Sequence, residues 1–143
     1  MELRLQDVVN GIVPVSQGWR TKARERLNNL AVPIGSLGQL LDLAEQLAAI
    51  KETLKPSVKK KAIVTMAGDH GVVDEGVSTC PQEVTSQMVY NFVAGGAGIN
   101  VLAEVAGGEV TVVDMGVAQD FGDLVAEGKI ISHKVGYGTG NMA

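Results

Sequence analysis

Acidic, histidine and glycine residues follow directly after an apolar run near the middle of the chain. The run covers residues 62–67, and Asp69, His70, Glu75 and Ser78 come soon after it. An uninterrupted apolar run of this length is typical of a strand buried on both faces of a parallel sheet. Ligands of open α/β sheets bind beyond the carboxyl ends of the strands. The pattern therefore predicts a small-molecule site just after residue 67.

Two more segments of the same kind follow two further expected strands. Asp114-Met115-Gly116 and the glycine-rich stretch 136–141 each come after a β-branched run. Helical patterns separate the runs, so we expect an α/β, Rossmann-like parallel sheet of about three strands with right-handed crossovers. The expected strands are 62–67, 109–114 and 129–135, and the expected helices are 81–93, 97–106 and 120–127. Parallel strands would bring all three polar segments to one edge.

The first third of the chain has a different, helical pattern. Residues 1–19 show weak periodicity and predict a loosely held lead-in, followed by a short helix over 20–31. Ser36 is a plausible N-cap for a second helix, along which apolar residues recur at helical spacing from Leu37 to Ala48. A polar connection over 51–61 follows. We expect a helical region over 1–55 and the first part of an α/β domain over 56–143.

Asp69 and His70 have two interpretations. They are binding residues, or Asp69 braces the turn after the strand while His70 makes a packing hydrogen bond. A metal site needs more ligands: His133 is expected inside the third strand, and Cys80 has no second cysteine. We therefore expect no metal, and the sequence indicates no other cofactor.

Cys80 and the closing glycines also allow more than one interpretation. A helix N-terminus lowers a thiol pKa, so Cys80 with His70 is a conceivable nucleophile and base. Nothing in the sequence orients such a base, which favours Cys80 as a pocket wall. The closing loop contains Gly136, Gly138 and Gly140, whose spacing differs from the dinucleotide-binding motif. A glycine-rich loop of this kind can still bind a phosphate or ribose through its exposed backbone N–H groups.

Charge and composition exclude several classes of protein. A formal net charge of −4 argues against a nucleic-acid partner, because phosphate backbones require a basic surface. The single cysteine fits a reducing cytosol, and no signal peptide is evident, so we expect a cytoplasmic protein. The uncharged stretch Val84 to Ala103 is interrupted by polar residues and glycines. Two short buried helices explain it better than a membrane span.

Three motifs in order carry a family resemblance: residues 33–38 (PIGSLG), residues 68–89 (GDHGVVDEGVSTCPQEVTSQMV) and residues 138–143 (GTGNMA). Together they resemble nicotinate-nucleotide:dimethylbenzimidazole phosphoribosyltransferases, which make the lower-ligand nucleotide of cobamides. Members of that family are more than twice this length. The resemblance therefore implies that the chain is the N-terminal portion of such an enzyme.

The resemblance also implies roles for particular residues. It places Cys80 and Met88 against the flat aromatic base, where some relatives that use dimethylbenzimidazole carry Ser and Gln. The base could therefore be dimethylbenzimidazole, another benzimidazole, a purine or a phenol. The full set of candidate substrate-binding residues is Asp69, His70, Ser78, Cys80, Pro81, Met88, Gly138, Thr139 and Asn141.

The family reaction moves 5-phosphoribose from nicotinate mononucleotide to a nitrogen of the base. The family's general base is a glutamate nearer the C-terminus, beyond Ala143, so no catalytic residue is assigned and the chain is expected to be inactive alone. Relatives are dimers whose small domain uses N-terminal helices, so we expect a homodimer and exposed apolar surface along Leu37 to Ala48. The alternative is a non-catalytic α/β domain that binds a small molecule or a partner.

Overall fold

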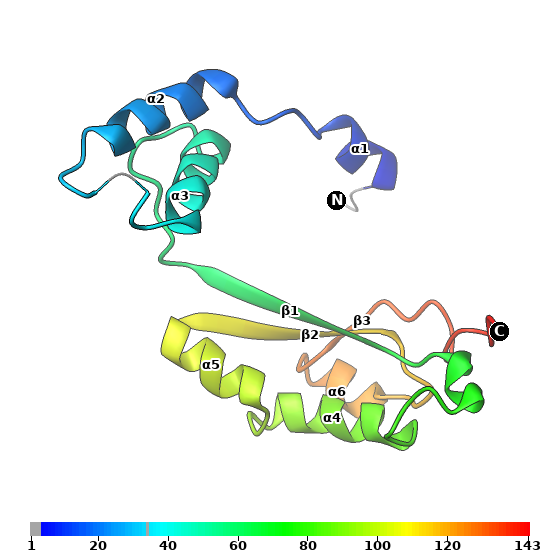
Figure 1. The fold of residues 1–143 in the computed structure, drawn as a ribbon. Coiled ribbons are helices and arrows are strands. Elements are labelled where there is room, and N and C mark those ends of the chain that lie inside the picture. Colours follow the sequence, from blue (N-terminus) through cyan, green and yellow to red (C-terminus); the bar gives the residue numbers. More distant parts are fainter. Residues whose placement is uncertain (1–3, 34) are drawn as a thin grey trace. The chain divides into compact units, whose positions relative to one another are not determined.

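The computed structural model describes residues 4–33 and 35–143 and separates into two compact units, Met1–Val58 and Lys59–Ala143 (Figure 1). Ile34 of the PIGSLG motif and the first three residues lie outside the described residues. Each unit is described by itself.

The first unit is helical. Its helices are α1 (Leu5–Asn10), α2 (Gln17–Asn28) and α3 (Gln39–Ile50). The lead-in over 1–19 contains the short helix α1, none of whose residues is buried. α2 begins three residues before the predicted start at residue 20 and ends three residues before the predicted end at residue 31. Ser16 caps α2, because its hydroxyl accepts a hydrogen bond from the Trp19 amide at 3.4 Å.

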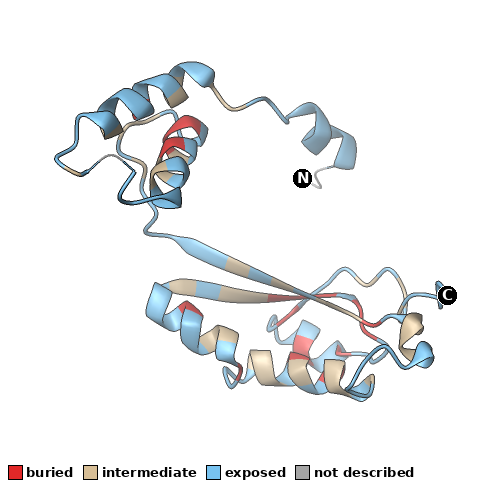
Figure 2. Ribbon diagram, in the orientation of Figure 1, coloured by how far each residue is buried: buried red, intermediate tan, exposed pale blue. Residues whose placement is uncertain are grey.

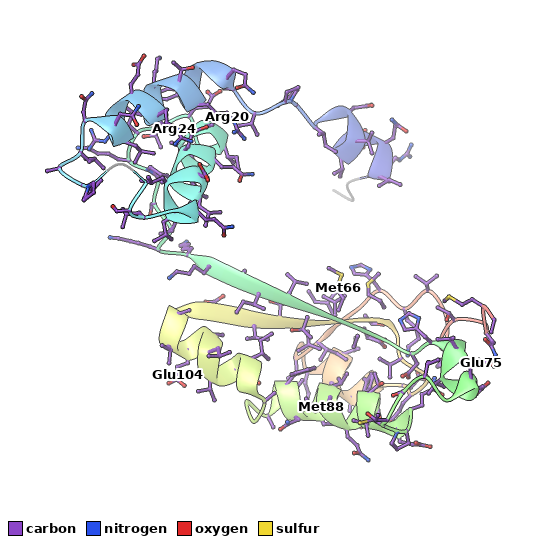
Figure 3. The ribbon with its side chains drawn as sticks, viewed as in Figure 1. Arg20, Arg24, Met66, Glu75, Met88 and Glu104 are labelled. Carbon is purple, nitrogen blue, oxygen red and sulfur yellow. The ribbon has the colours of Figure 1, made fainter. Side chains whose placement is uncertain are left out.

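The start of α3 differs from the prediction. Ser36 lies in a turn before the helix, and Gly38 occupies the cap position with a φ of 49°. This backbone conformation favours glycine, so the chain reaches the helix through Gly38 rather than through a serine cap. α3 packs on α2, and the buried Glu45 between them pairs with Arg20 at 3.4 Å and Arg24 at 2.5 Å (Figure 3).

The second unit contains a three-stranded parallel sheet. Its strands are β1 (Lys61–Gly68), β2 (Gly108–Gly116) and β3 (Ile131–Ser132), in the order β1-β2-β3, which confirms the predicted α/β fold with a three-stranded parallel sheet. The third strand is shorter than the predicted 129–135. The pairing of Gly68 with Gly116, next to that of Ala67 with Asp114, marks an irregularity at Met115. After β3, residues 133–135 continue along β2 through single backbone hydrogen bonds, from the His133 amide to the Asp114 carbonyl and from the Val135 amide to the Met115 carbonyl.

Three α-helices of this unit lie on one face of the sheet: α4 (Glu83–Val93), α5 (Gly98–Ala106) and α6 (Gly122–Ala126) (Figure 1). The 3₁₀ helix η1 (Gly71–Glu75) lies beyond the end of β1. α5 ends as predicted at Gly107, whose φ is +65°. α4 begins two residues after the predicted start at Pro81, so Cys80 lies in the loop before the helix that carries Met88.

The core of the second unit lies between the sheet and these helices. Its buried members are Val89, Val112, Val117, Phe121, Leu124 and Ile130. The prediction that β1 is buried on both faces was wrong: Val64 is 52% exposed and Met66 is 68% exposed (Figure 2). Within the described residues of this unit, helices cover only the opposite face, to which Ile63, Thr65 and Ala67 belong.

The segment Glu83–Ala106 is long and apolar enough to cross a membrane by length and composition alone, which is weak evidence. It consists of two helices, α4 and α5, as predicted, with a break at residues 94–97. The prediction that both helices are buried was wrong for α5, where Val101, Leu102 and Val105 are each more than half exposed. α4 packs against β1 and β2, and Val89 is fully buried there, so part of this apolar surface belongs to the core.

Candidate functional site

The three predicted polar segments meet at the carboxyl edge of the sheet. The Asp69 amide donates to the Gly116 carbonyl at 3.0 Å, which joins the ends of β1 and β2. The Gly71 amide donates to the Thr139 carbonyl at 3.1 Å, and the Thr139 amide donates to the Asp69 carbonyl at 3.0 Å. The convergence predicted from parallel topology is therefore confirmed.

Gly71 allows the two loops to approach this closely. A Cβ at this position would lie 2.6 Å from the Asn141 nitrogen and 2.8 Å from both the Gly140 carbonyl carbon and the Thr139 oxygen. All three are backbone atoms, which cannot rotate away as a flexible side chain can. Position 71 must therefore be glycine, because any side chain would collide with the backbone of segment 139–141.

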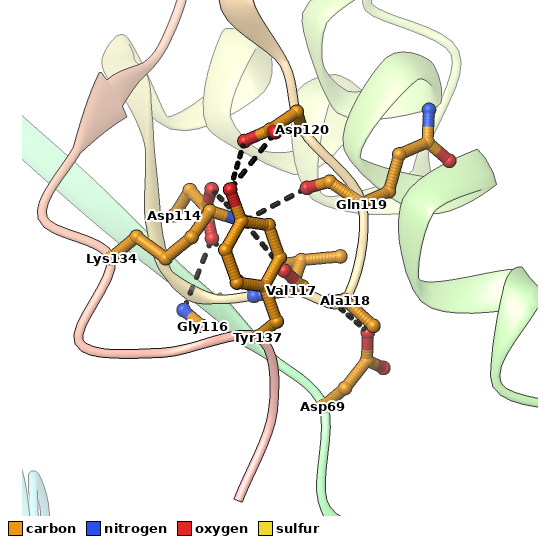
Figure 4. A network of polar contacts seen from close by, with 9 residues as sticks. All are labelled: Asp69, Asp114, Gly116, Val117, Ala118, Gln119, Asp120, Lys134 and Tyr137. Carbon is orange, nitrogen blue, oxygen red and sulfur yellow. Dashed lines mark hydrogen bonds and ion pairs between the residues drawn. The ribbon is translucent and has the colours of Figure 1, made fainter.

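Asp69 and His70 are both fixed by neighbouring segments. The Asp69 side chain is buried, and its Oδ2 accepts a hydrogen bond from the Ala118 amide at 2.8 Å (Figure 4). His70 is exposed, and its Nδ1 lies 3.4 Å from the Thr139 hydroxyl. Asp69 therefore braces the rim, as the structural alternative predicted, while His70 remains accessible to a ligand.

A first hollow opens between the end of β1, η1 and α4, with a volume of about 490 Å³. Six of the candidate residues line it: Asp69, His70, Ser78, Cys80, Pro81 and Met88. Met88 lies on α4 (Figure 3) and lines the hollow together with four other apolar residues: Val72, Val73, Val84 and Phe92. A hollow of this size and lining suits a small, largely apolar ligand.

A second hollow of about 490 Å³ lies at the same strand end, against segment 135–139. Gly138 and Thr139 line it, and Asp69 and His70 line both hollows. Asn141 lines neither hollow. Its side-chain amide donates a hydrogen bond to a carboxylate oxygen of Glu75 at 2.7 Å, and this bond connects segment 139–141 to η1. The nine candidates thus divide between two adjacent hollows and one tethering contact.

Cys80 has no activating base beside it. Its sulfur has one hydrogen-bonding neighbour among the described residues, the Thr79 hydroxyl at 4.0 Å, while the His70 ring contacts Thr139. Ser78 shapes this loop, because its hydroxyl accepts from the Cys80 amide at 3.2 Å and donates to the Cys80 carbonyl at 2.9 Å. The geometry agrees with a pocket wall and not with a nucleophile.

One cluster behind the rim escaped the sequence analysis. Asp114, 1% exposed, accepts hydrogen bonds from the Gly116 and Val117 amides through Oδ1 and pairs with Lys134 through Oδ2 at 2.9 Å (Figure 4). Tyr137 lies beside Lys134, and its hydroxyl donates to Asp120, which raises the pKa of Tyr137 above its ordinary value of 10.0. The signal available in the sequence was an acidic residue ending one strand and a lysine beside the next.

The fold and the two hollows define an α/β protein with two adjacent hollows at the carboxyl edge of a parallel sheet. A family model described as phosphoribosyltransferase matches residues 12–143. The chain belongs to this phosphoribosyltransferase family.

Relatives with assigned names agree with this family. The chain is 55% identical over 132 residues to a nicotinate-nucleotide–dimethylbenzimidazole phosphoribosyltransferase of Desulfotalea psychrophila and 53% identical over 139 residues to one of Geobacter metallireducens. These matches cover 92% and 97% of this chain but 37% and 38% of the relatives. The chain therefore spans less than two-fifths of their length, in accord with the expectation of a partial form.

A solved structure supports the fold directly. The crystal structure of the Thermus thermophilus enzyme of the same name superposes with a TM-score of 0.78 at 43% identity. The superposition covers 88% of this chain and 37% of that one. The resemblance inferred from the three motifs is thereby confirmed for the family and the fold.

Proposed function

We propose that this chain forms the base-binding portion of an enzyme that transfers 5-phosphoribose from nicotinate mononucleotide to dimethylbenzimidazole or a related base. The observation that carries this proposal is the first hollow. It brings Cys80, Met88 and His70 together beside an apolar wall at the carboxyl edge of the sheet. The names of the relatives supply the reaction.

The second hollow would receive the ribose or phosphate of the donor nucleotide. His70 lines both hollows, so two ligands bound side by side would meet over it. In such a transfer the barrier is the build-up of oxocarbenium character at the anomeric carbon. What the hollows would contribute is orientation, which holds the base nitrogen in line with that carbon.

No residue of this chain is assigned as the base that removes the proton. Asp69 is engaged by the Ala118 amide, and Glu75 holds Asn141. We propose that proton removal needs residues of the longer relatives that have no counterpart here. Turnover of nicotinate mononucleotide and dimethylbenzimidazole by residues 1–143 alone would contradict this part of the proposal.

Binding to the first hollow can be tested with a matched pair of variants. Met88→Trp would fill the hollow from α4, whereas Val105→Trp adds the same ring at an exposed position on α5. We expect the natural chain and Val105→Trp to bind dimethylbenzimidazole in a fluorescence titration, and Met88→Trp to lose binding at least tenfold. Equal binding by both variants would exclude this hollow as the base site.

A second candidate is a binding domain without chemistry. The first hollow is formed by the end of β1, η1 and α4, and these elements by themselves offer an apolar wall to an aromatic ligand. The two proposals separate when the chain is combined with the C-terminal part of a full-length relative. Restored ribosyl transfer supports the enzyme, and binding without any turnover supports the binding domain.

Assembly, domain assignment and location also belong to the proposal. The first 55 residues would form part of a small helical domain, and the whole enzyme would be a cytoplasmic homodimer. Support comes from α3, where Leu40 and Leu43 are more than half exposed and offer apolar surface for further polypeptide. A sedimentation measurement that finds a monomer at all concentrations would argue against the dimer.

A further inference from the structure

We propose that Lys134 is a positioning residue for the candidate site: its contacts with Asp114 and Tyr137 hold segment 136–139 against the Asp69-His70-Gly71 turn. Lys134 lines neither hollow. It acts through the segment that follows it, which forms one wall of the second hollow.

The ammonium of Lys134 is fully engaged. It pairs with the Asp114 carboxylate at 2.9 Å and donates to the carbonyls of Val117 at 2.5 Å and Gln119 at 2.8 Å (Figure 4). An ammonium has three N–H donors, and these three acceptors match that number. The acceptors belong to the end of β2 and to the loop after it. Lys134 therefore connects its own segment, residues 133–139, to residues 114–119.

Tyr137 continues this arrangement toward the site. Its ring centre lies 4.6 Å from the Lys134 nitrogen, and its hydroxyl donates to both carboxylate oxygens of Asp120, at 2.9 and 3.0 Å. The next residue, Gly138, turns the chain with a φ of +89°. Thr139 then makes its backbone hydrogen bonds with Asp69 and Gly71. Four residues thus separate the ion pair from the wall contacts.

The cost of burying two charges argues that the pair serves geometry more than stability. A buried ion pair regains little more than its desolvation penalty, whereas its directional bonds fix one arrangement of the chain. Segment 133–139 has few other ties to the sheet, because β3 ends at Ser132 and single backbone bonds follow. Without Lys134, the wall of the second hollow would lose its nearest buried anchor.

The test removes both charges together, so that no unpaired charge stays buried. In the double variant Asp114→Asn/Lys134→Met, the amide oxygen of Asn can still accept from the Gly116 and Val117 amides. The matched control, Glu127→Gln/Lys129→Met, removes an exposed ion pair whose atoms lie 2.6 Å apart. Tyr137→Ala provides a second variant, since it cuts the connection to the loop at an exposed residue and leaves the ion pair intact.

Amide hydrogen exchange, measured by NMR, separates positioning from stability. We expect the Gly71 and Thr139 amides of the double variant and of Tyr137→Ala to exchange at least tenfold faster, relative to the amides of the β1–β2 ladder. The control pair should change neither group. Exchange that speeds up by the same factor in loop and ladder, or loop amides that stay as protected as in the natural chain, would overturn the positioning role.

The consequence for ligands rests on the proposed function. We expect the double variant to lose affinity for nicotinate mononucleotide at least tenfold and to bind dimethylbenzimidazole within twofold of the natural chain. Equal loss of both ligands would contradict selective support of the second hollow. If the natural chain binds neither ligand, the proposed function fails, while the exchange measurement still decides the role of Lys134.

Discussion

Gly71→Ala tests whether the close approach of the two loops at the rim is as tight as the structure shows. The added Cβ would lie 2.6 Å from the Asn141 nitrogen, about 0.8 Å inside the 3.4 Å at which ordinary contact begins. The contacts at 2.8 Å with Gly140 and Thr139 are also with backbone atoms. Segment 139–141 therefore has to move away from residues 69–71.

Two costs set the size of the effect. Forcing an extra methyl group into a packed site typically costs about 1–3 kcal/mol. If segment 139–141 detaches instead, the two hydrogen bonds that join Thr139 to Gly71 and Asp69 are lost, at about 1 kcal/mol each. Detachment thus limits the cost, and we expect the second unit to lose about 2 kcal/mol.

Urea unfolding followed by circular dichroism and by hydrogen exchange gives the measurement. Trp19, the single tryptophan, lies in the first unit, so its fluorescence is an internal control that should not change. Gly140→Ala is the matched variant, because nothing lies within 4 Å of its added Cβ and no positive φ is required there. It should be neutral or slightly stabilising.

A loss below about 0.5 kcal/mol for Gly71→Ala would refute this reasoning, because neither overpacking nor two lost hydrogen bonds is that small. An equal loss in Gly140→Ala would also refute it, since the effect would then come from glycine content and not from the contact.

Three further changes test other parts of the fold. Thr65→Val should raise the free energy of unfolding by about 1 kcal/mol, because the Thr65 hydroxyl is buried and has no hydrogen-bond partner within residues 4–33 and 35–143; unchanged urea stability would contradict this. Phe121→Ala, at a residue 3% exposed in the core, should cost about 3–5 kcal/mol in the same assay, and a cost below 1 kcal/mol would argue against the packing shown. The neutral Tyr137 phenol donates a hydrogen bond to Asp120, so this contact is present below pH 10 and is lost as the pH rises through the raised pKa of Tyr137. Asp120→Asn should bring the pKa of Tyr137 back toward 10.0 in an ultraviolet titration. An unchanged titration would exclude Asp120 as the cause of the raised pKa.

The sequence was sufficient for features that depend on local pattern and topology. Apolar runs separated by helical periodicity predicted the parallel sheet, and parallel strands required the turns at Asp69, Asp114 and Gly138 to share one edge. Glycines after apolar helical segments located the end of α5 at Gly107. These features follow from backbone geometry that few residue types satisfy.

Features that depend on contacts between distant residues were not predictable in the same way. In the run 62–67 the face that carries Val64 and Met66 is no more polar than the opposite face, so the pattern could not show that these two residues are exposed. The length of the third strand depends on its pairing with β2, which includes only Ile131 and Ser132. Likewise, the partnership of Asp114 with Lys134 joins residues that only the sheet brings together.

The sequence predicted which residues belong to the candidate site, but not that these residues are distributed over two hollows. Six candidates gather in one hollow, whereas Gly138 and Thr139 line the other and Asn141 binds Glu75. Spacing along the chain identified residues that follow strands. It gave no information on which side of β1 each of them lies, because that depends on how the loops cross the strand end.

The pairing of β1 with β2 has a consequence for the newly made chain. The ladder joins Lys61 to Gly108, so nearly fifty residues must be synthesised and closed into a loop before the first strand gains its partner. Contacts so distant in sequence form late and slow the folding of a domain. Until then the run Ala62 to Ala67 remains an unpaired apolar strand, which makes the interval before β2 leaves the ribosome the time at which this protein is most prone to aggregate.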